Sequence, residues 1–128
     1  MSMYEKKHAL YLDYVREQES LLRIPEPISD DVVWNVCESY INSKDFKWIN
    51  LFDDNNEVCG FVIVDKTYAL ANDRTVLVQQ AYVIPENRKR GIVKQSVLDY
   101  IAEHSDKYNT YHIATNHTIE DFCPKKLL

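Results

Sequence analysis

The sequence has few residues of the kinds that break regular structure or cross-link a chain. Among 128 residues there are two glycines, four prolines and three cysteines. An apolar share of 45% and a charged share of 27% are typical of an ordinary folded domain, and they exclude collagen-like and low-complexity classes. No apolar run approaches the roughly 20 residues that a membrane-spanning helix needs, so we expect no membrane partner.

The cysteines predict neither disulfides nor a metal site. Cys37, Cys59 and Cys123 are odd in number and far apart in the sequence. The first residues, MSMYEKKHALYLDYV, carry charges and no small-residue cleavage site, which is not typical of a secretory signal. We therefore expect free thiols in a reducing, cytoplasmic compartment. The chain has no CxxC or HxxxH spacing, and we expect no metal.

The net charge of −5 at pH 7 argues against nucleic acid as a partner, because phosphate backbones require a dominant basic face. One stretch, IPENRKRGIV at residues 84–93, reverses this balance. An acidic protein with a single local basic patch is suited to a small anionic ligand. The cations in and beside the stretch are Arg88, Lys89, Arg90 and Lys94.

Hydrophobic periodicity divides the chain into helices and strands. Apolar residues recur every three or four positions where we predict helices, and they alternate or run together where we predict strands. Two prolines in RIPEPISDD separate the first two helices. The predicted helices are 3–22, 30–43 and 91–104, with a helical turn at 117–122, and the predicted strands are 47–52, 58–64, 75–84 and 110–115.

This order of elements predicts a single α+β domain covering residues 1–128. The turn DDNNE joins the first two strands as a hairpin, and the third strand, the following helix and the fourth strand form a crossover unit. We expect a mixed, mostly antiparallel sheet with helices on both faces. Gly60, inside the second strand, predicts a bulge or a close approach by another backbone.

The basic stretch lies where a strand ends and a helix begins. The first turn of a helix has unpaired N–H groups, and the helix dipole makes that end partly positive. Such an end binds phosphate when a ligand can approach. Gly91 has no Cβ to obstruct the approach, and the neighbouring cations add donors. The alternative interpretation is a solvated basic turn in which Gly91 only relieves strain.

The stretch AYVIPENRKRGIVKQSVLDYI resembles the signature of the GNAT N-acetyltransferase superfamily. In that superfamily a strand ends in Val-x-Pro-Glu and passes into Arg/Gln-x-x-Gly-x-Gly/Ala at the start of a helix. The order of elements resembles the superfamily over most of the chain, as does the segment NHTIEDFCPKKLL. The matching residues of the signature are Val83, Pro85, Glu86, Arg88, Gly91 and Val93.

The resemblance implies a GNAT-like acyl-CoA N-acyltransferase fold whose loop wraps the pyrophosphate of acetyl-CoA with backbone amides. It also implies that the third and fourth strands splay apart beyond Val83, and that the thioester slots between them. The residues that it implies for cofactor binding are Val83, Arg88, Lys89, Arg90, Gly91, Ile92, Val93 and Asn116.

The sequence departs from the superfamily at three places. Val93 stands where glycine or alanine is usual, so its side chain crowds either the phosphate cradle or the packing of helix on strand. Cys123 stands where many members carry a tyrosine that protonates the departing thiolate; a thiol can itself give a proton, although a small buried residue is the simpler interpretation. The chain also stops at Leu128, near where the superfamily begins a final strand pair.

Candidate catalytic groups are few. The strand at 75–84 carries no acid, and its Gln79 and Gln80 can orient a substrate but cannot take a proton. His112 has a suitable intrinsic pKa for a base, although it also fits a strand histidine packed beside tyrosines. We therefore name Cys123, His112 and a backbone N–H near Tyr82 or Val83, which would hold the oxyanion.

The predicted function is acetyl transfer from acetyl-CoA to a primary amine by direct attack on the thioester. The acidic surface favours a cationic small-molecule or peptide acceptor. A second chain, as in a homodimer, is one way to complete the shortened sheet. The alternative is a catalytically reduced GNAT-like module that binds CoA or a protein partner without turnover, and a weaker one is a plain interaction domain.

Overall fold

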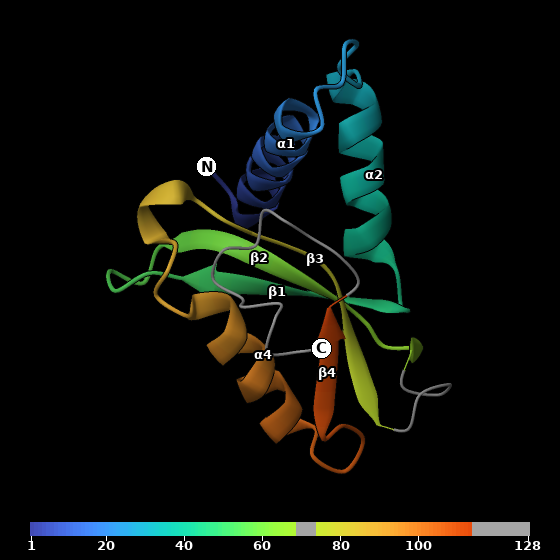
Figure 1. The fold of residues 1–128 in the computed structure, drawn as a ribbon, viewed down its shortest axis with the longest axis vertical. Helices are drawn as coiled ribbons and strands as arrows, with labels where there is room; N and C mark the ends of the chain where they lie inside the picture. Colours follow the sequence, from blue (N-terminus) through green and yellow to red (C-terminus); the bar gives the residue numbers. More distant parts are fainter. Residues whose placement is uncertain (69–73, 114–128) are drawn as a thin grey trace.

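The computed structural model describes residues 1–68 and 74–113, and its elements follow the predicted order closely (Figure 1). Each helix or strand begins and ends within two residues of its predicted bounds. The predicted helical turn at 117–122 lies outside the described residues. The elements are α1 (Met3–Leu21), α2 (Asp30–Asn42), β1 (Phe46–Phe52), β2 (Val58–Asp65), β3 (Thr75–Val83), a 3-10 turn (Pro85–Asn87), α4 (Ile92–Glu103) and β4 (Thr110–Ile113).

The described strands form one sheet in the order β1-β2-β3-β4. The β1–β2 and β2–β3 pairs are antiparallel, whereas β3 and β4 are parallel and are joined through α4. Helices α1 and α2 cover one face of the sheet and α4 covers the other (Figure 1). The α+β class, the hairpin, the crossover and the helices on both faces are therefore confirmed.

The two faces of the sheet pack with different side chains. Beneath α4 the core is mainly aliphatic, with Val62, Val78 and Val97 fully buried. Beneath α1 and α2 it is largely aromatic, with Phe61 and Tyr11 in contact at a ring separation of 5.6 Å. Strand β2 is buried over most of its length because both of its faces are covered.

Two features of β3 prepare the site described below. Gly60 on β2 lies so close to β3 that an added Cβ would approach the Tyr82 carbonyl oxygen to 2.1 Å, which confirms the predicted close approach of another backbone. Farther back, Gln80 pairs with Ile63 and Val78 pairs with the next residue of β2. Gln79 is thus the extra residue of a β-bulge, a feature that bends a strand and interrupts its pairing.

Within the described residues, no helix is long and apolar enough to cross a membrane. The recorded pairing of β3 with β4 runs from Thr75–Thr110 to Val78–Ile113. The residues after Ile113 are not described, so the predicted parting of the two strands beyond Val83 stays a prediction.

Candidate functional site at the start of helix α4

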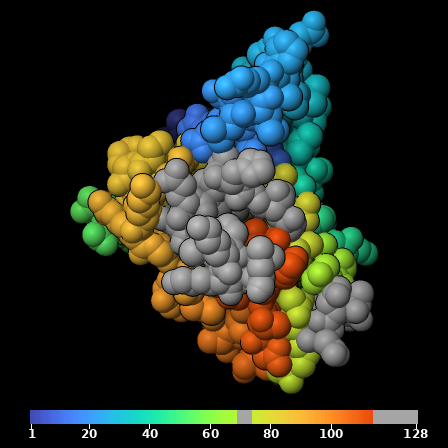
Figure 2. All heavy atoms as spheres, viewed as in Figure 1, coloured from blue at the N-terminus to red at the C-terminus, as the bar shows by residue number. Residues whose placement is uncertain are grey.

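The connection from β3 to α4 contains two residues in the left-handed backbone region. Lys89 has φ of 66°, and Gly91, which immediately precedes α4, has φ of 71°. Glycine adopts this region at no steric cost, whereas lysine does so rarely. Left-handed residues in such a turn direct successive backbone N–H groups toward a common concave side, which suits an anion. The loop lies on the surface, gold in Figure 2.

Helix α4 begins without a side-chain cap. Gly91 supplies no side chain, the first turn contains no acidic residue, and the first internal bond is the 2.9 Å contact from the Gln95 N–H to the Gly91 oxygen. The amides of Ile92 and Val93 therefore precede the internal hydrogen-bond ladder. A Cβ added to Gly91 would meet no atom of the described residues within 4 Å, so none of these residues crowds the position.

Val93 does not point into the loop. Its side chain is 1% exposed and belongs to the aliphatic core between α4 and the sheet. Its side chain was expected to crowd either the phosphate cradle or the packing of helix on strand. The structure places it in the packing of α4 on the sheet. The Val93 side chain leaves the open side of the loop unobstructed.

Arg88 makes its side-chain contacts within the protein. Its Nε donates to the Val83 carbonyl oxygen at 2.7 Å, and its guanidinium donates to both carboxylate oxygens of Glu17 on α1, at 3.0 and 2.7 Å. The guanidinium also lies over the Tyr82 ring, 5.3 Å from its centroid. These contacts fix the loop against α1. Its predicted role as a pyrophosphate ligand stays a prediction, and it would require some of these donors to change partner.

The backbone of β3 presents its amides alternately to its two edges. The Ile84 N–H donates to the Cys59 oxygen on β2 at 2.9 Å. Because hydrogen-bonding direction alternates along a strand, the Tyr82 amide faces β2 as well, and the Ala81 and Val83 amides face the opposite edge. Of the two predicted oxyanion donors, this geometry favours Val83. The Tyr82 side chain is 8% exposed and packs in the aromatic core.

Two carboxylates of α1 lie near this end of β3. Burial raises the pKa of the Tyr82 phenol, and Asp13 and Glu17 raise it further, because a negative charge opposes ionisation. Desolvation also raises the pKa of Asp13. Asp13 and Glu17 were not predicted as site residues, since a helix that alternates apolar and charged positions is ordinary. Their spacing of four residues, which places them on one side of α1, was the available signal.

The remaining predicted residues are not brought to the loop. His112 is exposed, stacks near Tyr68 with ring centroids 6.3 Å apart, and pairs in register with Leu77. Six residues of strand separate Leu77 from Val83, which corresponds to about 20 Å. Asn116 and Cys123 lie outside the described residues, so their predicted roles stay predictions.

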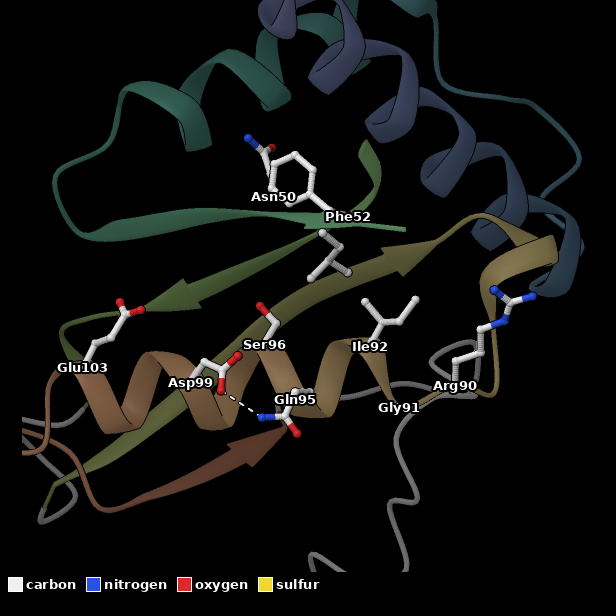
Figure 3. Close-up of a pocket in the computed structure, with 10 residues that line it drawn as sticks. Asn50, Phe52, Arg90, Gly91, Ile92, Gln95, Ser96, Asp99 and Glu103 are labelled. Carbon is white, nitrogen blue, oxygen red and sulfur yellow. Dashed lines mark hydrogen bonds between the residues drawn. The ribbon is translucent and has the colours of Figure 1, made fainter. Parts of the chain in front are cut away.

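A hollow of about 510 Å³ lies beside the loop, between the end of β1 and the exposed side of α4 (Figure 3). Arg90 and Gly91 lie at one end of it and Glu103 at the other (Figure 3). Asp99 accepts a 2.8 Å hydrogen bond from the Gln95 side chain within it. An anion therefore fits only the Arg90 end. The lining residues are Asn50, Leu51, Phe52, Arg90, Gly91, Ile92, Gln95, Ser96, Asp99 and Glu103.

The chain has the GNAT acetyltransferase fold, as its similarity to solved structures shows. No protein-family model and no curated protein sequence matches it. A possible acetyltransferase from Clostridium difficile 630 superposes with a TM-score of 0.62 at 12% identity, covering 91% of this chain and 78% of the other. A ribosomal-protein-alanine N-acetyltransferase from Brucella melitensis biovar Abortus 2308 gives 0.59 at 17% identity, covering 97% and 83%.

A third similar structure is an aminoglycoside N-acetyltransferase in complex with CoA. Its TM-score is 0.55 at 17% identity, and the similarity covers 87% of this chain and 72% of the other. At these identities the similarity establishes the fold, while activity and substrate depend on the residues of this chain.

Proposed function

We propose that the protein is an acetyl-CoA-dependent N-acetyltransferase. The observation that carries the proposal is the start of α4, which has no side-chain cap and follows two left-handed residues, Lys89 and Gly91, within a GNAT fold. Unpaired amides and the helix dipole stabilise a bound phosphate there. The backbone amides from Lys89 to Val93 are assigned to the pyrophosphate, with Arg90 adding a charge beside them.

The edge of β3 that faces away from β2 is assigned to the acyl arm. The Val83 amide points to this edge and supplies a hydrogen-bond donor for a carbonyl oxygen that becomes negative during the reaction. The Ala81 amide lies two residues back along the same edge and supplies a second donor farther from the phosphates. Acetyl-CoA brings a thioester, whose carbonyl carbon is attacked by the amine while the thiolate leaves.

The acceptor side is assigned to the end of β3 that faces α1. Asp13 and Glu17 place negative charge there, which favours a cationic amine and raises its local concentration. Glu17 is already paired with Arg88, so Asp13 is the carboxylate assigned to acceptor recognition. The amine must lose a proton to attack. His112 pairs in register with Leu77, about 20 Å from Val83 along the strand, so it is not assigned as the proton acceptor. Cys123 remains the predicted proton donor.

The first experiment measures binding of acetyl-CoA by calorimetry to the wild type and to the Arg90→Gln variant. We expect binding by the wild type and a weakening of several-fold in the variant, because a single exposed charge near a phosphate is lost. A matched control is Arg23→Gln, which removes an exposed charge from the loop between α1 and α2. Equal effects of the two substitutions, or no binding by the wild type, would contradict the assignment of the Gly91 loop to the pyrophosphate.

The second experiment measures release of the CoA thiol with panels of polyamines, aminoglycosides and peptides. Turnover with one class identifies the acceptor. A CoA-binding module without turnover is the competing function, and the observation that favours it is the absence of a carboxylate from β3, whose sequence is TVLVQQAYV. Binding of acetyl-CoA without thiol release for any amine supports that second function.

A further inference from the structure

The end of the molecule opposite the Gly91 loop carries an unusual concentration of positive charge. Helix α4 has 12 residues and is therefore about 18 Å long. The Gly91 loop lies at its start, whereas two adjoining hollows lie beyond its end, where α4 approaches the start of β3 and the end of β2 (Figure 1). In Figure 2 this region is the orange and lime end of the molecule.

The two hollows share three lining residues, Lys66, Lys107 and Tyr108. The first has a volume of about 460 Å³ and the second of about 330 Å³. Lys66 and Lys107 therefore border both of them. The other lining residues are Lys44, Asp45, Thr67 and Arg74 in the first, and Lys47, Tyr100, Glu103 and His104 in the second.

Five cationic side chains and two carboxylates line the pair of hollows, in a chain whose net charge is −5. Within the parts of the chain that are described, none of the four lysines has an ion pair or a side-chain hydrogen bond. Arg74 donates to the Ser105 carbonyl oxygen at 2.5 Å, which is a neutral acceptor. The five cations outnumber the two carboxylates, so the lysines repel one another, and a bound anion removes that repulsion.

The floor of the hollows is fixed by buried aromatic residues. Tyr108 is 5% exposed and Tyr100 is 8% exposed, and their rings stack with centroids 5.8 Å apart. His104 donates from Nδ1 to the Tyr100 carbonyl oxygen at 2.9 Å, so its ring orientation is set and Nε2 is the nitrogen left for other contacts. A concave site with a floor of packed aromatic residues suits a small ligand more than a broad flat surface does.

We infer that these hollows bind a compact anion with two or more phosphate groups, such as inorganic polyphosphate or a nucleoside triphosphate. Lys66 and Lys107 stand between the two hollows and contact phosphates on either side, while Lys44, Lys47 and Arg74 contribute from the rims. Glu103 and Asp45 limit the positive area to the centre, which excludes a long strand of nucleic acid that needs a continuous basic track. The site is separate from the proposed acetyl-CoA cradle.

The test is calorimetric titration with inorganic tripolyphosphate at low ionic strength. We expect saturable binding to the wild type and a weakening on the order of tenfold for each of Lys66→Gln and Lys107→Gln, because hydrogen bonds to charged groups are the strong ones. Lys44→Gln and Lys47→Gln on the rims should weaken binding less. The matched control is Arg23→Gln, which removes one exposed charge far from the hollows and should leave the affinity unchanged.

Further arms separate this site from the cradle and from nucleic acid. Arg90→Gln should weaken only the binding of tripolyphosphate at the Gly91 loop, and it should leave intact the binding that depends on Lys66 and Lys107, because it alters only the Gly91 end of α4. The inference is overturned if tripolyphosphate does not bind, if Arg23→Gln or Arg90→Gln weakens that lysine-dependent binding as much as the lysine variants do, or if a single-stranded RNA oligonucleotide binds the same lysines more tightly than tripolyphosphate. Circular dichroism of each variant confirms that it is folded.

Discussion

Helices α1 and α4 begin in opposite ways. At the start of α1 the Ser2 hydroxyl accepts the Glu5 N–H at 3.1 Å, and the Glu5 carboxylate accepts the Ser2 N–H at 3.1 Å. Helix α2 is capped by Ser29, whose hydroxyl accepts the Val32 N–H at 3.3 Å. Helix α4 begins at Gly91 with no side-chain acceptor. A serine side chain therefore accepts a first-turn N–H of α1 and of α2, whereas no N-cap side chain does so for α4.

The described helices therefore begin in two ways, with a serine side chain as cap or with no side-chain cap. A serine cap contributes about 1 kcal/mol to stability, and α4 lacks that contribution. The loop before α4 contains Lys89 in the left-handed region, which is unfavourable for a residue with a side chain. Both features reduce stability, and under the proposed function both leave backbone amides available to the pyrophosphate. We therefore expect substitutions at the serine caps to change the free energy of unfolding, and substitutions at the start of α4 to change acetyl-CoA affinity.

The largest effect is expected from Gly91→Val. A β-branched residue at φ of 71° is strained by about 1–3 kcal/mol, so the loop must change shape. We expect acetyl-CoA affinity to fall by roughly ten- to a hundredfold, as measured by calorimetry. Gly91→Asn is the matched control, because asparagine tolerates this region and open space surrounds the position. Unchanged acetyl-CoA affinity in the Gly91→Val variant would show that Gly91 is not part of the pyrophosphate site.

The next effect concerns the pair of Arg88 and Glu17. Both side chains are largely buried, with exposures of 15% and 25%, so removing either partner should lower the free energy of unfolding by about 1–2 kcal/mol. If Arg88 only positions the loop, Arg88→Gln and Glu17→Gln should weaken acetyl-CoA binding to a similar extent. If Arg88 contacts the pyrophosphate directly, Glu17→Gln should leave or improve binding, while Arg88→Gln weakens it.

Removing the serine caps should affect stability without affecting binding. For Ser2→Ala and Ser29→Ala we expect the free energy of unfolding to fall by about 1 kcal/mol each, as measured by urea denaturation. Acetyl-CoA affinity should stay at its wild-type value, because neither cap lies at the start of α4. A loss of affinity in either variant would show that the division between the two kinds of helix start is incomplete.

Much of the fold was predictable because periodicity is a local property of the sequence. Apolar spacing predicts α4 as a helix, although it does not select the buried side that Val93, Val97 and Tyr100 form. The β-branched run of β2 predicts a strand covered on both faces. The crossover through α4 then follows from the order of the elements and the handedness of such units. The presence of glycine at position 60 also indicated a close approach by another backbone, and β3 makes that approach.

The candidate site was only partly predictable, because its contacts join distant segments. Glu17 is 71 residues from Arg88, and nothing local to either residue indicates the pair. Val93 looked like an obstacle to the ligand until its direction into the core was known. The left-handed conformation of Lys89 was not predicted either, since lysine does not favour it. The local sequence indicates where the loop lies. The packing of α1 against it determines that Arg88 contacts Glu17.

The smallest effect is expected from the carboxylate of the α1 cap. Hydrogen bonds from the Ser2 backbone and then from its side chain lower the pKa of Glu5, so its ionised form stabilises the fold. That contribution is present above the ordinary pKa of glutamate and is lost as the pH falls through the lowered value. In Ser2→Ala the Glu5 pKa should move part of the way back toward its ordinary value, as followed by carboxyl carbon shifts in NMR titration. An unchanged Glu5 pKa in Ser2→Ala would mean that the Ser2 hydroxyl does not help to lower it. No carboxylate lies in the first turn of α4, so the start of that helix should show no such acid-dependent contribution.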